Sequence, residues 1–412
     1  MRIKVKKIIY FISKWYEGTS YKNIVFMQDN FGGEIIKDDI HGVIKSIEKK
    51  KPDLMVVRGD AKIDYKIPMN RNIPYILIEN DVNSLRRGSN KHAEMQDREK
   101  IENASAVIFT SEEHAEYYEK MKKKYGWKMP YYEVIYTRPL KKDLDFDPIE
   151  KLEGLNLVYA GGVIANWNKA DSIYGYRCYH KIFGKFIEAG WKVHIYSASY
   201  NNNKLREYRE LGCITYNNMP YKKLLQEMSR YTAGLHSYNK INVSNITYDY
   251  TQTCRPNKLW DYLAAGIPTI GYQGGNGMKI YDGKWGIVID DLEMETLNKI
   301  PERLKKLRIT KRMRYGNVMD KDIEVFRRVI KEALEEAKNR KKKRYHVSKS
   351  LYKIKDSTRF PNRIKVHNKG VISIYRGGYI FPPGETSREL IVNMRTYKEI
   401  KAHVSLKIEY VE

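Results

Sequence analysis

The chain of 412 residues contains only three cysteines, and they are far apart in the sequence. Cys178, Cys213 and Cys254 form neither a CxxC metal motif nor the dense disulfide framework of a small secreted domain. The nine histidines lack zinc spacing. Apolar runs such as residues 8–12 are far shorter than the roughly 18 residues of a membrane-spanning helix. The basic N-terminus has neither the apolar stretch nor the cleavage site of a signal peptide. These absences argue against a secreted, membrane-spanning or zinc-based protein, and we expect a cytoplasmic one.

The chain has many more positively charged residues than negatively charged ones. Its 76 Lys and Arg residues outnumber 50 Asp and Glu residues, which gives a net charge of +26. Residues 301–412 hold 30 of the positive and 13 of the negative groups, so they contribute +17 of this excess. Such a field attracts polyanions, and we expect an anionic partner: a nucleic acid, or a glycan at an anionic membrane surface. The alternative is a lysine-rich composition with a solvated helix end at residues 341–344.

Short apolar runs alternate with longer amphipathic stretches, which is the pattern of an α/β protein with parallel sheets. Before residue 135 this predicts five buried strands at residues 7–12, 23–27, 54–57, 75–78 and 106–109, and helices at 38–50 and 112–124. After a polar stretch at 137–154, it predicts strands at 156–160, 192–196, 233–237, 268–271 and 286–289, and helices at 179–189, 221–231 and 256–265.

The sequence therefore predicts two Rossmann-like domains, residues 1–140 and 155–345, joined by a linker at 141–154. A functional cleft is expected between them, where the strands end. The second domain would finish in a basic helical segment. Residues 346–412 alternate in polarity around Gly and Pro turns and predict a small all-β appendage of unknown role.

The strongest functional signal lies in residues 255–270, where Pro and Gly bound a short helix. Asn257, Lys258 and Asp261 are three and four residues apart, so they share one helix face. A cation near a helix N-terminus suits a diphosphate, and a carboxylate there suits ribose hydroxyls. A surface cap with an i,i+3 ion pair would use the same residues.

This segment resembles the donor-binding helix of GT-B glycosyltransferases, near the large retaining family called group 1 or family 4. The resemblance covers residues 50–340 loosely and is specific only in the second domain. It implies a GT-B fold, with two Rossmann-like domains facing across a cleft, and transfer of a hexosyl group from a nucleotide sugar to a hydroxyl. A UDP- or GDP-linked donor is expected, with no other cofactor and no metal. The family usually has Glu where this chain has Asp261, and a second Glu where it has Thr253.

The same resemblance extends to other parts of the second domain. Residues 157–163 look like its first strand and glycine turn, and either Lys169 or Arg177 is expected to grip the diphosphate. Residues 274–277 look like a later glycine loop. The implied donor-binding residues are Gly161, Gly162, Lys169, Arg177, Asn257, Lys258, Asp261 and Gly275.

In the first domain, the strand at 75–78 runs into the polar residues Glu79, Asn80 and Asp81, which a purely structural strand end does not require. Asp81 or Glu79 could orient or deprotonate an acceptor hydroxyl. Arg86 or Arg87, in a stretch that resembles the acceptor-side loop of GT-B enzymes, could contact phosphate. A strand-end turn with a helix cap is the alternative.

An early glycine pair, Gly32 and Gly33, could form a turn near the donor phosphates. Two other functions remain open beside transfer: a nucleotide-sugar 2-epimerase of the same fold, and a non-catalytic nucleic-acid-binding or virion-associated protein. A viral origin would place the protein in the host cytoplasm, and a glycan acceptor would place it at a membrane periphery.

Overall fold

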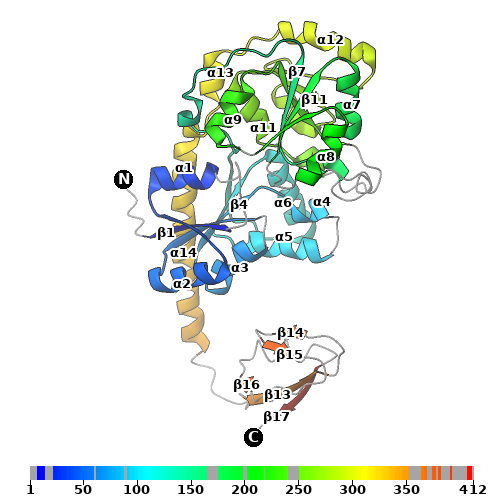
Figure 1. Ribbon diagram of the computed structural model, residues 1–412. Coiled ribbons are helices and arrows are strands. Elements are labelled where there is room, and N and C mark those ends of the chain that lie inside the picture. The colour runs from blue at the N-terminus through cyan, green and yellow to red at the C-terminus, as the bar shows by residue number, and fades with distance from the viewer. Residues whose placement is uncertain are drawn as a thin grey trace. The chain divides into compact units, whose positions relative to one another are not determined.

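The computed structural model describes residues 7–13, 22–59, 62–87, 91–164, 175–197, 202–217, 219–239 and 250–351, and five short strands between 363 and 410. The chain forms two compact units, Met1–Arg340 and Lys341–Glu412. The first unit contains two six-stranded sheets, each with helices packed against it (Figure 1). We refer to the two sheets with their helices as the first and second domains.

All neighbouring strands of the first sheet are parallel, in the order β2-β1-β3-β4-β5-β6. The strands are β1 (Ile8–Ser13), β2 (Glu34–Asp38), β3 (Leu54–Arg58), β4 (Tyr75–Glu79), β5 (Ala106–Phe109) and β6 (Tyr131–Val134). The helices are α1 (Lys22–Phe31), α2 (Ile40–Lys50), α3 (Lys62–Asn70), α4 (Asn83–Arg87), α5 (Lys91–Asn103) and α6 (Glu112–Tyr125). Strands β3, β4 and β5 are buried throughout because apolar side chains point to both faces, and helices cover both.

One strand prediction in this domain is wrong. Residues 23–27 form part of helix α1, and the strand that follows β1 is β2, which the apolar pattern missed. A short apolar run does not distinguish a buried strand from a buried helix face. Strand β2 escaped notice because it lies at the sheet edge, where only Ile36 of its five residues is buried.

The second sheet is also parallel and has the order β12-β11-β10-β7-β8-β9. Its strands are β7 (Asn156–Ala160), β8 (Lys192–Tyr196), β9 (Ile214–Tyr216), β10 (Ala233–Ser237), β11 (Thr269–Tyr272) and β12 (Gly286–Val288). Its helices are α7 (His180–Glu188), α8 (Asn202–Glu210), α9 (Tyr221–Met228), α11 (Lys258–Ala265), α12 (Met294–Lys305) and α13 (Lys311–Gly316). This is the strand order of a Rossmann fold, and the order reverses between β7 and β10. The predicted α/β class with two Rossmann-like sheets is confirmed.

The chain passes between the domains twice, and the two passages contact each other. The first contains the short helix η2 (Lys141–Leu144) and the second contains η6 (Met319–Asp322). The Met319 amide donates to the Pro139 carbonyl at 3.0 Å, and the Lys141 amide donates to Asp320 Oδ2 at 2.7 Å. These bonds hold the two connections side by side.

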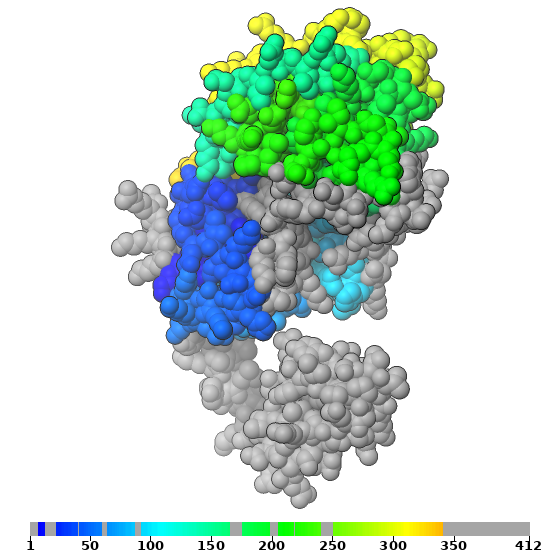
Figure 2. Space-filling model, viewed as in Figure 1, coloured from blue at the N-terminus to red at the C-terminus, as the bar shows by residue number. Residues whose placement is uncertain are grey.

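Helix α14 (Ile323–Leu351) follows the second passage and returns to the first domain (Figure 1). Its residues Phe326, Val329 and Ile330 join the core cluster that contains Tyr10 of β1. The rings of Phe326 and Phe26 are 5.1 Å apart. Burial of this apolar stripe attaches the end of the first unit to its first strand. Figure 2 shows the surface of the first domain, in blue, next to the green surface of the second domain.

The described strands of the second unit are antiparallel. They are β13 (Arg363–Asn368), β14 (Ile374–Arg376), β15 (Tyr379–Phe381), β16 (Leu390–Ile391) and β17 (Leu406–Tyr410). Strand β13 pairs with β16 and β17, and β14 pairs with β15.

All three cysteines are buried and free. Burial raises the pKa of Cys178, Cys213 and Cys254, that of Cys213 to about 12. In the part of the chain that the structure describes, no helix is long and apolar enough to cross a membrane.

Candidate active site

A cluster of positive charge lies where β7 ends, at the point where the second sheet reverses its strand order. A Cβ atom added to Gly161 would lie 3.3 Å from Lys258 Nζ, and one added to Gly162 would lie 3.3 Å from Arg177 Nη1. The bare backbone of the glycine turn therefore lets both cations approach it. The structure brings these four predicted donor-binding residues together, while Lys169 lies outside the described residues.

Lys258 is the first residue of α11 and is only 9 % exposed. Its ammonium lies 3.8 Å from the centroid of the Tyr159 ring. Burial lowers the pKa of Lys258 well below its ordinary value, and the positive charge of Arg177 lowers it further. No hydrogen bond or ion pair to this ammonium is found among the described residues. An anion bound at the glycine turn would supply the missing partner.

Asp261, one turn further along α11, already has partners. Its Oδ1 accepts hydrogen bonds from Lys22 Nζ at 2.8 Å and from the Tyr221 hydroxyl at 2.5 Å. Lys22 belongs to α1 of the first domain, so the carboxylate joins the two domains. Its role toward a ribose stays a prediction. Asn257 precedes the helix, makes no side-chain cap, and accepts from the Asp261 amide through its carbonyl.

Gly275 lies beside a different feature. It has φ +68°, and a Cβ there would come within 2.3 Å of the Thr251 carbonyl oxygen. With Tyr238, Gln252 and Asn276 among its neighbours, it lines a cavity of about 430 Å³ at the ends of β10 and β11. Its contact with the donor stays a prediction.

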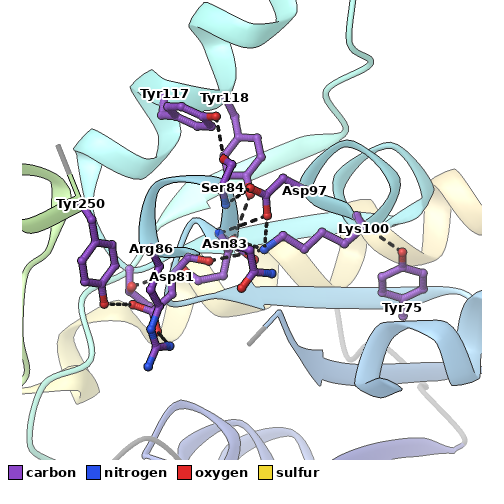
Figure 3. A network of polar contacts seen from close by, with 12 residues as sticks. Tyr75, Asp81, Asn83, Ser84, Arg86, Asp97, Lys100, Tyr117, Tyr118 and Tyr250 are labelled. Carbon is purple, nitrogen blue, oxygen red and sulfur yellow. Dashed lines mark hydrogen bonds and ion pairs between the residues drawn. The ribbon is translucent and has the colours of Figure 1, made fainter. Parts of the chain in front are cut away.

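In the first domain, Asp81 follows β4 and holds two partners (Figure 3). Its Oδ2 lies 2.7 Å from Arg86 Nη1, and its Oδ1 accepts from the Tyr250 hydroxyl of the second domain at 2.6 Å. Burial acts to raise the pKa of Asp81, but Arg86, the Tyr250 hydrogen bond, His114 and Arg177 together outweigh it and hold the pKa below its ordinary value. The carboxylate is therefore ionised at neutral pH.

The predicted acceptor side and donor side meet at this point. The positive charge of Arg177 acts to lower the pKa of Asp81. The positive charge of Arg86 acts to lower the pKa of Arg177. The charges of Arg177, Arg86 and Asp81 all act on the pKa of Tyr176, which burial raises. Arg87 ends α4, and its side chain lies outside the described atoms.

Glu79 does not face this site. It is fully buried, and its Oε1 accepts from Lys100 Nζ at 2.5 Å and from the Tyr118 hydroxyl at 3.0 Å. A carboxylate without exposed surface cannot reach an acceptor hydroxyl, so we correct its predicted catalytic role to a structural one. Of the two predicted carboxylates, only Asp81 remains a candidate for chemistry.

Gly32 and Gly33 also lie elsewhere. They connect the end of α1 to the start of β2, and a Cβ on Gly33 would meet the Ile8 carbonyl oxygen at 2.7 Å. Because Ile8 begins β1, this is the amino-terminal edge of the parallel sheet, opposite the edge that carries Asp81. We therefore exclude the two glycines from the site.

The segment between residues 250 and 255 holds the second domain against the start of α6. Arg255 forms two hydrogen bonds with the Glu113 carboxylate, at 2.7 and 2.8 Å, and a third with the Tyr136 hydroxyl at 2.6 Å. The Ser111 hydroxyl, which caps α6, donates to the Thr253 carbonyl at 3.1 Å. No local sequence pattern predicts these contacts. The contacts that Tyr159 and Tyr250 make have no such pattern either.

No protein-family model matches the chain, and no curated protein matches it. Solved structures are similar in fold at low sequence identity. Pneumococcal O-GlcNAc transferase GtfA, solved with UDP and GlcNAc, is 13 % identical, with 73 % of this chain and 61 % of that chain covered and a TM-score of 0.48. This chain thus spans about three fifths of the length of GtfA. WaaG, a glycosyltransferase of lipopolysaccharide biosynthesis, is 12 % identical over 81 % of this chain and 94 % of that one, with a TM-score of 0.47.

A further similar structure is the UDP-GlcNAc 2-epimerase of Methanocaldococcus jannaschii. It is 12 % identical, with 78 % of this chain and 99 % of that chain covered and a TM-score of 0.46.

This chain itself has two Rossmann-like sheets joined by a linker, with a final helix that returns to the first sheet. The fold is GT-B. In this GT-B chain the cationic glycine turn and Asp81 come from facing domains, which are in contact through Tyr250.

Proposed function

We propose that this chain is a glycosyltransferase that moves a hexosyl group from a nucleotide sugar to a hydroxyl acceptor. The donor would bind the second domain and the acceptor the first. One observation carries the proposal: Lys258 and Arg177 lie beside the Gly161–Gly162 turn at the strand-order reversal, and the charge of Arg177 acts to lower the pKa of Asp81 from the other domain. Ligands of open α/β sheets bind at such reversals.

The donor side suits departure of a nucleoside diphosphate. As the bond from the sugar to the diphosphate breaks, negative charge grows on the phosphate oxygens. Lys258 and Arg177, beside the glycine turn, are the groups that would stabilise it. The Tyr159 ring holds the Lys258 ammonium in place before the ligand arrives, so little reorganisation is needed.

The acceptor side suits orientation of a hydroxyl by Asp81. An ionised carboxylate accepts a hydrogen bond from that hydroxyl and favours the positive charge of an oxocarbenium-like transition state. Arg86 and Tyr250 hold the carboxylate by one oxygen each, which fixes its plane. The acceptor itself would be anionic, a nucleic acid or a glycan at a membrane surface, because of the charge of residues 301–412.

Nucleotide binding is the first test. Melting temperatures would be measured with UDP-, GDP-, ADP- and CMP-sugars for the parent, Lys258→Met and Arg177→Met. We expect one nucleotide to raise the melting temperature of the parent, and each variant to bind it about 10- to 100-fold more weakly, because a charge-assisted hydrogen bond is lost. Lys185→Met, which removes an exposed lysine, is the matched control. Equal binding by all four proteins would disprove the site.

Product analysis then separates transfer from epimerisation. The donor that binds is incubated alone and with candidate acceptors, and sugars are resolved by chromatography. We expect glycosylated product only with an acceptor, and loss of turnover without loss of nucleotide affinity in Asp81→Asn. Conversion of the donor to its 2-epimer without acceptor would instead establish an epimerase, the activity named for the Methanocaldococcus jannaschii structure above. An acceptor affinity that does not fall as salt rises would argue against a polyanionic acceptor.

A further inference from the structure

A completely buried ion network lies beneath the Asp81 loop. Glu79, Asp97 and Lys100 are each 0 % exposed. Lys100 Nζ lies 2.5 Å from Glu79 Oε1. The same ammonium lies 2.9 Å from Asp97 Oδ1 (Figure 3). Lys100 and Asp97 are one turn apart on α5, while Glu79 ends β4.

The hydrogen bonds of this network end on the main chain around Asp81. Lys100 Nζ donates to the Asp81 carbonyl at 3.4 Å. Asp97 accepts from the amides of Asn83 and Ser84, at 3.2 and 2.8 Å, with one oxygen for each. These amides are the first two of α4, so Asp97 caps the helix that carries Arg86.

A purely structural strand end does not need these groups. Burying three charges costs desolvation energy, and apolar residues of similar volume often stabilise a protein at least as well. What apolar residues cannot do is form hydrogen bonds with the backbone of the Asp81 loop. Lys100 fixes the chain at Asp81 itself and Asp97 fixes it two and three residues later.

We propose that Asp97 and Lys100 are positioning residues that hold the Asp81 carboxylate and its partner Arg86 in the geometry for reaction. The catalytic part of this inference rests on the proposed transferase function, whereas the structural part does not. Asp97 acts through the start of α4, and Lys100 acts through the backbone of residue 81. Neither side chain reaches the site, since both are fully buried.

The test uses the full chain and three variants. Asp97→Asn keeps the side-chain volume and removes the charge that binds two amides. Lys100→Met combined with Glu79→Gln removes the buried cation together with one buried charge partner, which limits the loss of stability. Tyr118→Phe is the matched control, because it removes a hydrogen bond to Glu79 from the same network but touches no backbone atom of residues 81–84.

Amide hydrogen exchange, followed by mass spectrometry without ligand, measures the positioning directly. We expect exchange in peptides covering residues 80–87 to become about tenfold faster or more in Asp97→Asn and in the double variant, and to change little in Tyr118→Phe. Peptides of β5 and β7 should keep the rate of the parent. Unchanged exchange at 80–87, or an equal increase along the whole chain, would overturn the inference.

Kinetics then test the link to reaction. With the donor identified above, we expect kcat to fall about 10- to 100-fold in Asp97→Asn while the KM for the nucleotide sugar stays constant, because a misplaced group affects the reacting geometry rather than nucleotide binding. Faster local exchange with an unchanged kcat would overturn the catalytic part. If the parent turns over no nucleotide sugar, the proposed function fails, and the exchange data alone decide whether the network positions Asp81.

Discussion

The ammonium of Lys22 lies 2.8 Å from Oδ1 of Asp261, although the two residues are 239 positions apart in the sequence. Their side chains are only 6 % and 7 % exposed, and the same ammonium lies 3.7 Å from the centroid of the Tyr221 ring. The first turn of α1 is thereby joined to the helix expected to hold the donor. A ligand that donates hydrogen bonds to the Asp261 carboxylate would therefore change a contact between the domains.

Lys22→Met should lower the stability of the folded chain substantially. Removal of one partner from a buried pair leaves an uncompensated charge, and we expect the free energy of unfolding to fall by about 3 to 5 kcal/mol. Urea unfolding followed by circular dichroism measures it. Lys185→Met breaks an ion pair whose side chains are 42 % and 55 % exposed, and should cost less than about 1 kcal/mol. Similar losses in both variants would contradict this account.

Nucleotide binding should be coupled to uptake of a proton by Lys258. Burial lowers the pKa of this lysine in the free protein, and a bound diphosphate would raise it again. At pH values between the pKa of Lys258 in the free protein and its pKa in the nucleotide complex, the complex holds more protons than the free protein. The affinity for the nucleotide therefore falls as pH rises through this range. Calorimetry of nucleotide binding in buffers of different ionisation enthalpy detects the proton. We expect uptake in the parent and none in Lys258→Met; equal proton exchange in both would refute the coupling.

Tyr250→Phe should move the acid limb of the pH–rate profile. The hydroxyl of Tyr250 is one of the groups that lower the pKa of Asp81, so its loss raises that pKa. If ionised Asp81 orients the acceptor, turnover in the variant will begin to fall at a higher pH than in the parent. The profile of kcat against pH measures the shift. Tyr315→Phe, which removes a hydroxyl bound to the Leu144 carbonyl, should leave the limb in place.

Gly234→Ala should destabilise the second domain by overpacking. A Cβ at this position of β10 would lie 2.4 Å from carbons of the buried Tyr262 ring. We expect a loss of about 1 to 3 kcal/mol in the free energy of unfolding, since neither the strand nor the ring can move freely. Gly316→Ala, at the end of α13, meets no atom within 4 Å and should be neutral or slightly stabilising. Thermal unfolding of the two variants distinguishes these effects.

The buried strands could be predicted from sequence because they are continuous apolar runs with polar ends. Strand β5, for instance, has the predicted bounds, Ala106–Phe109. The glycine turn and Lys258 could be selected because residue type, spacing and the resemblance all pointed to the same edge of one sheet. The strand prediction for residues 23–27, which lie in helix α1, was wrong because the apolar run there is short. No local pattern distinguishes a buried helix face from a strand in so short a run.

The partners of the selected residues could not be predicted. Tyr250 and Asp81 are 169 positions apart, and no periodicity relates a tyrosine in one domain to a strand end in the other. Glu79 and Asp81 are two residues apart and have the same chemistry, yet Glu79 is buried in the core whereas Asp81 contacts Tyr250 of the other domain. Side-chain direction at a strand end depends on the helix that packs against it, here α5 with Lys100.

The buried cysteines give the protein a practical advantage. Because burial keeps Cys178, Cys213 and Cys254 inaccessible and protonated, thiol reagents should leave the folded chain unmodified. A single cysteine introduced on each domain surface would then be the only reactive pair. Fluorophores attached there could report, molecule by molecule, how far the domains separate when a nucleotide binds or leaves, without any change to the native thiols.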